Sequence, residues 1–384
     1  AFSILVPSGS VTDSASLAGL SNLTCEMTLR GAGPYDSRAY VEALDRLGVD
    51  RNEGVGEMHS HFGVAGLADK LEQAMEVVAE AVLRPHLPED QLEQARQVLY
   101  QELWAIEDEP SQKLMQELRN AHYPDPWGRP NTGSLETLAQ IEIDDVRRHF
   151  EQTYRPNGAI IGVAGKIDWN RLVDTVGRLF GEWKSREAAP IVTEETGVRR
   201  KHIHEDISQT HIGIGYDSVP YRHDDYILAW SGRGVLSGGT SARLFTEVRE
   251  NRGLCYTIYA TYHTLLDRAG IFCYAGTSAD RAQETLDVSL RLLDELRGGI
   301  VEDELFRLKA RIKSALIMQQ ESSSSRSGSI AGDWYHLGRV RPLTEIEAMI
   351  DGLTCEKINR YLAEHYPKDY TICVLGPEEL EVPR

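Results

Sequence analysis

Cysteine is scarce in this chain, and the few cysteines present form no recognisable pattern. The sequence contains 5 cysteines among 384 residues. Their spacing includes no CxxC pair, and an odd number of widely separated thiols does not build a disulfide framework. We therefore expect a reducing compartment, the cytoplasm; a leader removed ahead of residue 1 would instead allow the periplasm. The cysteines are Cys25, Cys255, Cys273, Cys355 and Cys373.

Long apolar runs and an excess of positive charge are also missing. No stretch approaches the ~18 consecutive apolar residues of a membrane-spanning helix. Lys and Arg together number 41 against 59 Asp and Glu, which gives a formal net charge of −18. A charge of this sign opposes binding to nucleic acid or to an anionic membrane surface. We therefore expect neither nucleic acid nor a membrane as a partner.

The length and the order of elements predict two domains of the same class. A chain of 384 residues suits two domains of about 190 residues each. Helices and strands mix without a strict βαβ rhythm, which favours an α+β fold over a doubly wound one. Each half closes on an apolar strand that ends in glycine. We predict domains at residues 1–185 and 201–384, joined by a polar linker at residues 186–200.

Residues 240–262 predict a helix that ends at a glycine and leads directly into a strand. An apolar helical stripe and a charged run precede Gly253, the residue type that most often terminates helices. From Leu254 the pattern alternates with period two, which predicts that Leu254 and Tyr256 lie on the same strand face. The turn therefore brings Arg249 close to Tyr256. A guanidinium beside a phenol is suited to binding a peptide carbonyl or a terminal carboxylate.

The pattern TSARLFTEVRENRGLCY in this segment resembles the C-terminal half of the pitrilysin/insulinase zinc metallopeptidases. That family includes the subunits of the mitochondrial processing peptidase and small bacterial two-chain peptidases. The segments WAIEDEPSQKLM and YPDPWGRPNTGSLETLAQI are similar to two further family segments, so the resemblance covers essentially the whole chain. It implies two tandem homologous α+β domains, each an antiparallel sheet flanked by helices, as in one half of a metallopeptidase clamshell. It also implies that Arg249 and Tyr256 hold the main chain of a peptide substrate.

The zinc motif of that family is missing from the first long helix. Active members carry HxxEH there, in which two His bind zinc and the Glu is the general base, and a later Glu is the third ligand. The resemblance places the two His positions at Asn22 and Glu26, the base at Cys25 and the later ligand at Glu102. Helical spacing predicts that Asn22, Cys25 and Glu26 share one polar face. Because Asn ligates zinc poorly and Cys does not replace a carboxylate base, we expect no catalytic residue, metal or cofactor in this chain.

Two groups of histidines are weaker candidates for a metal site. His59 and His61 lie two residues apart on a predicted strand and therefore point to one face. His202 and His204 repeat this spacing, with His211 nearby. Because neither pair has a third ligand placed by the sequence, a solvated strand face is the simpler interpretation.

Serine and glycine clusters are interpreted as structural. Ser14 or Ser16 is expected to cap the first long helix, and the serine-rich residues 319–329 are expected to interrupt two later helices. The serine run has no GxSxG context, so a serine nucleophile is not predicted. The glycines at 238 and 239 lack the Gly-Lys-Ser/Thr pattern of a phosphate loop, and the resemblance implies a turn bordering the substrate cavity.

These observations lead to one hypothesis and two alternatives. The chain is interpreted as the non-zinc subunit of a heterodimeric zinc metallopeptidase, whose zinc lies in a homologous HxxEH-bearing partner and whose substrates are unfolded peptides. The first alternative is a catalytically inactive scaffold or peptide-binding homologue. The second is a homodimeric peptidase with an unusual metal site at Cys25, Glu26 and Glu102.

Overall fold

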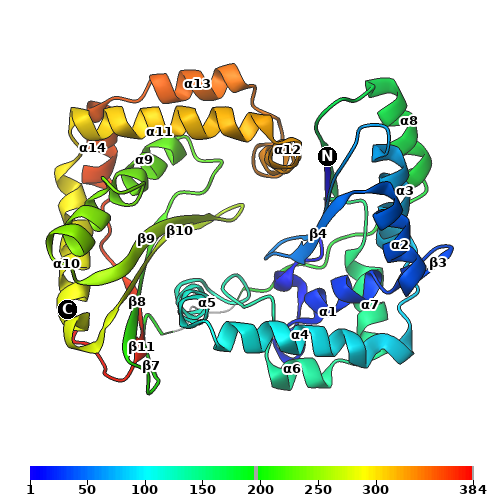
Figure 1. Ribbon diagram of the computed structural model, residues 1–384, viewed down its shortest axis with the longest axis horizontal. Coiled ribbons are helices and arrows are strands. Elements are labelled where there is room, and N and C mark those ends of the chain that lie inside the picture. Colours follow the sequence, from blue (N-terminus) through cyan, green and yellow to red (C-terminus); the bar gives the residue numbers. More distant parts are fainter. Residues whose placement is uncertain (194–197, 383–384) are drawn as a thin grey trace. The chain divides into compact units, whose positions relative to one another are not determined.

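The computed structural model describes residues 1–193 and 198–382 of the chain (Figure 1). Their contacts divide them into two compact units. The first unit contains residues 1–105, 129–193 and 319–340, and the second contains residues 106–128, 198–318 and 341–382. Part of the predicted linker, residues 194–197, lies outside the described residues.

The first unit is built on a four-stranded antiparallel sheet. Its strands follow the order β4 (Asp50–Val55), β5 (Ser60–Ala65), β1 (Phe2–Val6), β6 (Ile160–Val163). Alternate residues of β1 are buried in the core, as the period of two requires. Amphipathic helices bury their apolar faces in the cores of this unit. They are α1 (Leu20–Thr28), α2 (Ser37–Leu47), α3 (Leu71–Leu83), α4 (Leu92–Glu107), α6 (Leu135–Gln140), α7 (Ile143–Thr153) and α8 (Trp169–Phe180), with a small hairpin of β2 (Gly31–Ala32) and β3 (Tyr35–Asp36).

The second unit is built on a five-stranded sheet. Its strands follow the order β7 (Arg200–His204), β11 (Thr371–Gly376), β8 (Gln209–Ser218), β10 (Ala269–Ser278), β9 (Cys255–Thr264). Neighbouring strands are antiparallel except for β7, which runs parallel to β11. One face carries α9 (Tyr226–Leu236) and α10 (Ala282–Glu295), and α5 (Pro110–His122) covers the other (Figure 1). The remaining long helices are η4 (Phe245–Asn251), α11 (Glu302–Glu321), α13 (Leu343–Asp351) and α14 (Cys355–Glu364).

Each sheet is covered on its second face by a helix from the other half of the sequence. Helix α5 packs on β8 and β11, and α12 (Ser323–Leu337) packs on β6 and β1. Glycines allow both contacts: a Cβ at Gly213 of β8 would lie 3.1 Å from the Leu118 side chain, and one at Gly162 of β6 would lie 2.3 Å from the Ser327 carbonyl oxygen. The predicted α+β class, with a mainly antiparallel sheet and flanking helices in each unit, is confirmed. The predicted domain boundaries at residues 185 and 201 stay a prediction. The packing shows in addition that α5 belongs to the second unit and α12 to the first, an exchange of helices between the two halves of the sequence.

Two predicted helix boundaries are wrong. The first long helix does not begin at Ser14 or Ser16, because Gly19 has a left-handed backbone (φ 92°) and α1 begins after it. The serine-rich stretch does not form a long interruption, since only Ser322 separates α11 from α12. The Ser322 hydroxyl accepts a hydrogen bond from the Ser325 N–H, so this serine is a helix cap.

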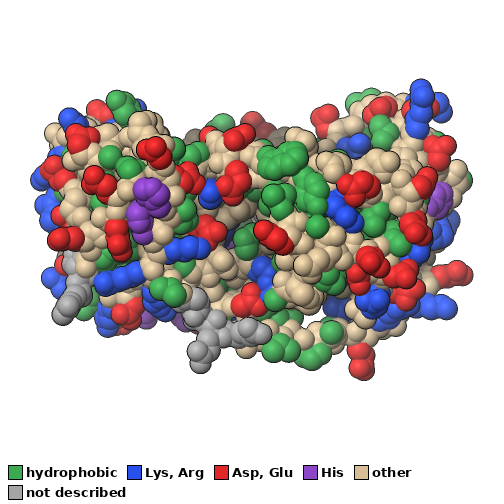
Figure 2. Space-filling model, turned by 90° about the horizontal axis from the view of Figure 1, so that it is seen from below, with side chains coloured by type: hydrophobic (Ala, Val, Ile, Leu, Met, Phe, Trp, Pro, Cys, Tyr) green, Lys and Arg blue, Asp and Glu red, His purple; other side chains and the backbone are tan. Residues whose placement is uncertain are grey.

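Charges of both signs are interspersed on the surface. Figure 2 shows acidic and basic side chains alternating over the viewed face. Several of them pair, as Lys201 does with Glu117 at 2.6 Å. Such mixing is expected where surface charges compensate their neighbours and do not build a field of one sign. Within the described residues, the helices are too short or too polar to cross a bilayer.

Candidate functional site

Arg249 lies on an irregular helix just before a sharp turn. The helix η4 is a π-helix, a widened form that is often found at functional sites. Val248 is fully buried, whereas Arg249 is exposed. Gly253 ends the helix with a left-handed backbone (φ 61°), and its N–H donates to the Arg249 carbonyl at 3.1 Å. The predicted change from helix to strand at this glycine is confirmed.

The Arg249 guanidinium has no carboxylate partner among the described residues. Its contact there is with the ring of Phe245, 4.9 Å from the centroid. Arg252, one turn further on, pairs with Glu247 at 2.8 Å and with Glu284 at 3.2 Å. The two arginines therefore differ in kind: Arg252 is compensated within the fold, and Arg249 keeps its five N–H donors for another group.

Tyr256 projects into solvent because of a β-bulge at the start of β9. Cys255 pairs with Thr277 of β10, and Thr257 pairs with Gly276, so Tyr256 is an extra residue without a partner. Its side chain is 79% exposed, whereas Cys255 is buried. The prediction that Tyr256 shares a face with Leu254 is wrong, because a bulge interrupts the alternation. Bulges recur beside active sites, where they redirect one side chain.

Three of the four degenerate zinc-motif positions come together in the first unit. The Asn22 side-chain amide of α1 donates to the Glu102 carboxylate of α4 at 3.2 Å. Glu26 accepts from the Arg30 guanidinium at 2.7 Å. Burial raises the pKa of Glu26, an effect that Arg30 opposes and that the nearby Glu102 carboxylate increases. Asn22 and Glu102 thus bond to each other, and Glu26 bonds to Arg30.

Cys25 does not lie on the predicted polar face. It is 3% exposed and belongs to the apolar core that contains Phe62 and Tyr154. Burial, followed by the charge of Glu53, raises the pKa of the Cys25 thiol to about 12. Zinc binds thiolate and not thiol, so this thiol is unsuited to ligation. The prediction for Cys25 was wrong because α1 is buried on two sides, against separate apolar clusters.

The residues at these positions do not fit a zinc ion. Cys25 is a buried thiol, Asn22 presents a donor to Glu102, and Glu26 is bound by Arg30. Throughout the described ranges, no three His, Cys, Asp or Glu are grouped to hold a metal. We therefore derive no chemical step through zinc in this chain.

The histidines of the second predicted group, His202, His204 and His211, have structural partners. His202 and His204 approach the carbonyl oxygens of Gly376 and Pro377, at 3.0 and 3.2 Å. The His211 ring bonds to the Tyr274 hydroxyl at 2.7 Å. Because one ring nitrogen of each is already used, these histidines are explained by the fold.

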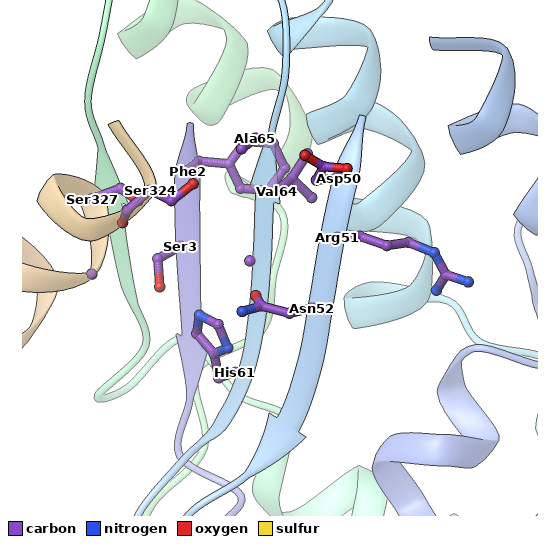
Figure 3. A pocket seen from close by; sticks show the side chains of 12 residues that line it. Phe2, Ser3, Asp50, Arg51, Asn52, His61, Val64, Ala65, Ser324 and Ser327 are labelled. Carbon is purple, nitrogen blue, oxygen red and sulfur yellow. The ribbon is translucent and has the colours of Figure 1, made fainter. Parts of the chain in front are cut away.

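A polar cavity of about 220 Å³ opens on the sheet of the first unit. Figure 3 shows Ser3, Asn52 and His61, from three adjacent strands, directed toward the same space. Ser3 is 2% exposed and its hydroxyl has no hydrogen-bond partner among the described residues, so Ser3 and His61 do not form a nucleophile pair. Burial lowers the pKa of His61, which favours its neutral form. Sequence analysis missed this cavity, although the strand alternation that buries Phe2 is the signal that turns Ser3 to the other face.

The fold and these sites define a protein of two α+β units in which Asn22, Cys25, Glu26 and Glu102 do not form a set of zinc ligands. The sequence model described as insulinase (peptidase family M16) matches residues 1–132. The model described as peptidase M16 inactive domain matches residues 140–312. The chain therefore belongs to peptidase family M16.

Relatives of similar length support the same assignment. The chain is 26% identical to an uncharacterised zinc protease, YmxG, of Bacillus subtilis, over 98% of this chain and 93% of that protein. It is 23% identical to an uncharacterised zinc protease of Rickettsia felis, over 99% and 93%. Two solved structures share the fold. A peptidase M16 inactive domain from Pseudomonas fluorescens has a TM-score of 0.90 at 21% identity, covering 100% of this chain and 93% of that one. A protease from Helicobacter pylori has a TM-score of 0.89 at 20% identity, covering 97% and 93%.

Proposed function

We propose that this chain is the substrate-binding, non-zinc subunit of a heterodimeric zinc metallopeptidase. Its partner is a homologous chain of similar length that carries the HxxEH motif and the zinc. The substrates are unfolded peptides. One observation carries the proposal: the turn at Gly253 exposes a guanidinium without a carboxylate partner and a bulged, solvent-exposed phenol, at Arg249 and Tyr256.

The chemistry of these two side chains suits the backbone of a peptide. The Arg249 guanidinium donates to one or two carbonyl oxygens, and a charged donor roughly doubles the strength of such bonds. The Tyr256 hydroxyl donates to a carbonyl or accepts from an N–H. Neither interaction reads a side chain, so many sequences are accepted. Holding the main chain in this way places the scissile bond for the partner's zinc and lowers the entropic part of the barrier.

The replaced zinc ligands agree with a pair of subunits in which one binds zinc and the other binds substrate. Positions that would hold a metal in an active chain are here an amide–carboxylate bond and an arginine–carboxylate pair. The exposed arginine and tyrosine are retained, which a purely structural homologue does not require. A scaffold remains the second candidate, because loss of the zinc ligands agrees with it equally well.

Removing the Tyr256 ring is expected to weaken peptide binding about tenfold, the effect of one hydrogen bond and one apolar contact. The measurement is fluorescence anisotropy of a labelled unstructured peptide with the purified chain and its Tyr256→Ala variant. Tyr256→Phe separates the hydroxyl from the ring. Thr257→Ala is the matched control, since Thr257 is exposed on the same strand but paired with Gly276. Equal affinity for wild type and Tyr256→Ala would favour the scaffold.

A further inference from the structure

A second cavity, of about 230 Å³, lies in the second unit beside the glycine turn that precedes η4. Its walls are the end of α9, residues 238–242 and one side of α11, which contributes Arg307, Leu308 and Arg311. Glycines and arginines make up much of the lining, which also contains the Thr240 and Ser241 hydroxyls and the Glu304 carboxylate. Because Arg243 already binds Glu304, the charge left for a ligand in this cavity is positive.

Arg311 is the uncompensated cation of this cavity. Its guanidinium lies against Gly238, where an added Cβ would be 1.8 Å from Nη1, so only glycine leaves room for it. In the part of the chain that the structure describes, it has no hydrogen bond and no ion pair, and burial lowers its pKa. A half-buried charge without a partner is costly, and an anionic ligand offsets that cost.

The neighbouring arginines show what compensation looks like. Arg243 binds Glu304 through two hydrogen bonds, of 2.7 and 2.8 Å, and also reaches the Gly299 carbonyl. Arg307 lines the same cavity as Arg311 but pairs with Asp303. Glu304, which lines the cavity, and Asp303 are therefore already bound to arginines.

A second cation increases the positive potential behind Arg311. Arg233 directly precedes Gly234. A Cβ added at Gly234 would lie 3.5 Å from Nη2 of Arg311. The Arg233 Nε is buried and, within residues 1–193 and 198–382, has no hydrogen-bond partner. Burial lowers the pKa of Arg233, and the charge of Arg311 lowers it further. Two neighbouring cations make the local charge positive, although the net charge of the chain is −18.

We propose that the cavity formed by Arg311 and the glycine turn at residues 238–242 is a carboxylate-binding subsite for peptides. The ligand is an Asp or Glu side chain or the C-terminal carboxylate of the peptide. This inference rests on the proposed function, because it names the charge of the substrate that Arg249 and Tyr256 hold. Arg311 supplies the planar pair of donors that matches a carboxylate.

The chain segment that connects the two sites indicates how many peptide residues separate them. Residues 243–251 are helical, so the seven residue steps from Ala242 to Arg249 span on the order of 10 Å. An extended peptide covers that distance with about three residues. The carboxylate is therefore expected about three residues away from the peptide unit held by Arg249.

The test is anisotropy of four labelled peptides that differ only in charge. One carries Glu and a free C-terminus, the second has Gln in place of Glu, the third is amidated, and the fourth combines both changes. We expect wild type to bind the fully neutral peptide about tenfold to a hundredfold more weakly than the first, the range for a charged hydrogen-bonded pair. The second and third peptides show which carboxylate is bound.

Two variants complete this experiment. In Arg311→Gln the difference between charged and neutral peptides should disappear, whereas in Arg307→Gln it should persist, because Arg307 is already paired with Asp303. Equal affinity of wild type for all four peptides, with binding still lost in Arg249→Ala, would overturn the subsite and leave the proposed function intact. Absence of binding for every peptide would overturn both. A difference that persists in Arg311→Gln would also overturn the assignment to this cavity.

Discussion

Mixed with the proposed HxxEH-bearing partner, the Arg249→Ala variant is expected to cleave an unstructured peptide with kcat/KM about 100-fold below wild type. The reason is the loss of a charged donor that no other residue replaces. A hundredfold loss corresponds to about 3 kcal/mol, the upper range for a hydrogen bond to a charged group. Because the interaction positions the scissile bond, kcat should fall together with kcat/KM. The measurement is a steady-state assay with a quenched peptide at fixed subunit ratio.

Two further variants make this result specific. Arg252→Ala should retain activity within about threefold, because Arg252 is an exposed ion-pair partner of Glu247 and Glu284 and such pairs contribute little. Arg249→Lys keeps the charge but loses the planar pair of donors, so it should recover only part of the activity. Equal losses in Arg249→Ala and Arg252→Ala would mean that the segment folds incorrectly and that Arg249 has no special role.

Restoring the family's general base by Cys25→Glu is expected to destabilise the protein by about 3–5 kcal/mol, the cost of an uncompensated buried charge. The thiol occupies an apolar site at 3% exposure, and the charge of Glu53 already raises its pKa. A carboxyl group there would be larger than the thiol and would meet like charge. Chemical denaturation of the purified chain measures the change in the free energy of unfolding.

A matched comparison separates charge from volume. Cys25→Gln has nearly the size of Cys25→Glu but carries no charge, so it should cost less at neutral pH. If charge causes the larger destabilisation of Cys25→Glu, that destabilisation should become smaller as the pH falls, because the carboxyl group is then protonated. Unchanged stability of Cys25→Glu, together with tight zinc binding by Asn22→His/Cys25→Glu/Glu26→His, would show that a metal site is still accommodated.

The sequence was sufficient for the fold class and for the turn that carries the candidate site. The helix stop at Gly253 has a local cause, a left-handed backbone that glycine adopts freely. The α+β class followed from the order of amphipathic segments. Both features depend on interactions over a few residues, which a single sequence records.

Features that depend on distant pairing were not predictable. The bulge at Tyr256 exists because β9 shifts its register against β10. The residues of β9 do not by themselves indicate this shift. Burial of Cys25 depends on a second apolar cluster, which includes residues of β1 and β5 outside the helix itself. The edge strand β4 was also missed, since its polar residues show no apolar alternation.

The exchange of α5 and α12 between the two units could be predicted only in part. Its signal is present as alternating glycine in β8, where Gly213 and Gly215 leave room for side chains on the covered face. That pattern indicates a close approach but does not identify the approaching helix. Contacts between segments far apart in the sequence supply the missing information.

The most direct test of the central claim is peptidase activity of the wild-type chain on a quenched unstructured peptide, alone and mixed with a homologous HxxEH-bearing chain from the same organism. We predict no turnover by this chain alone and turnover in the mixture that a zinc chelator abolishes. Chelator-sensitive turnover by this chain alone would contradict the account and restore a metal site at Cys25, Glu26 and Glu102. A mixture no more active than the HxxEH-bearing chain by itself would contradict it as well and leave the scaffold.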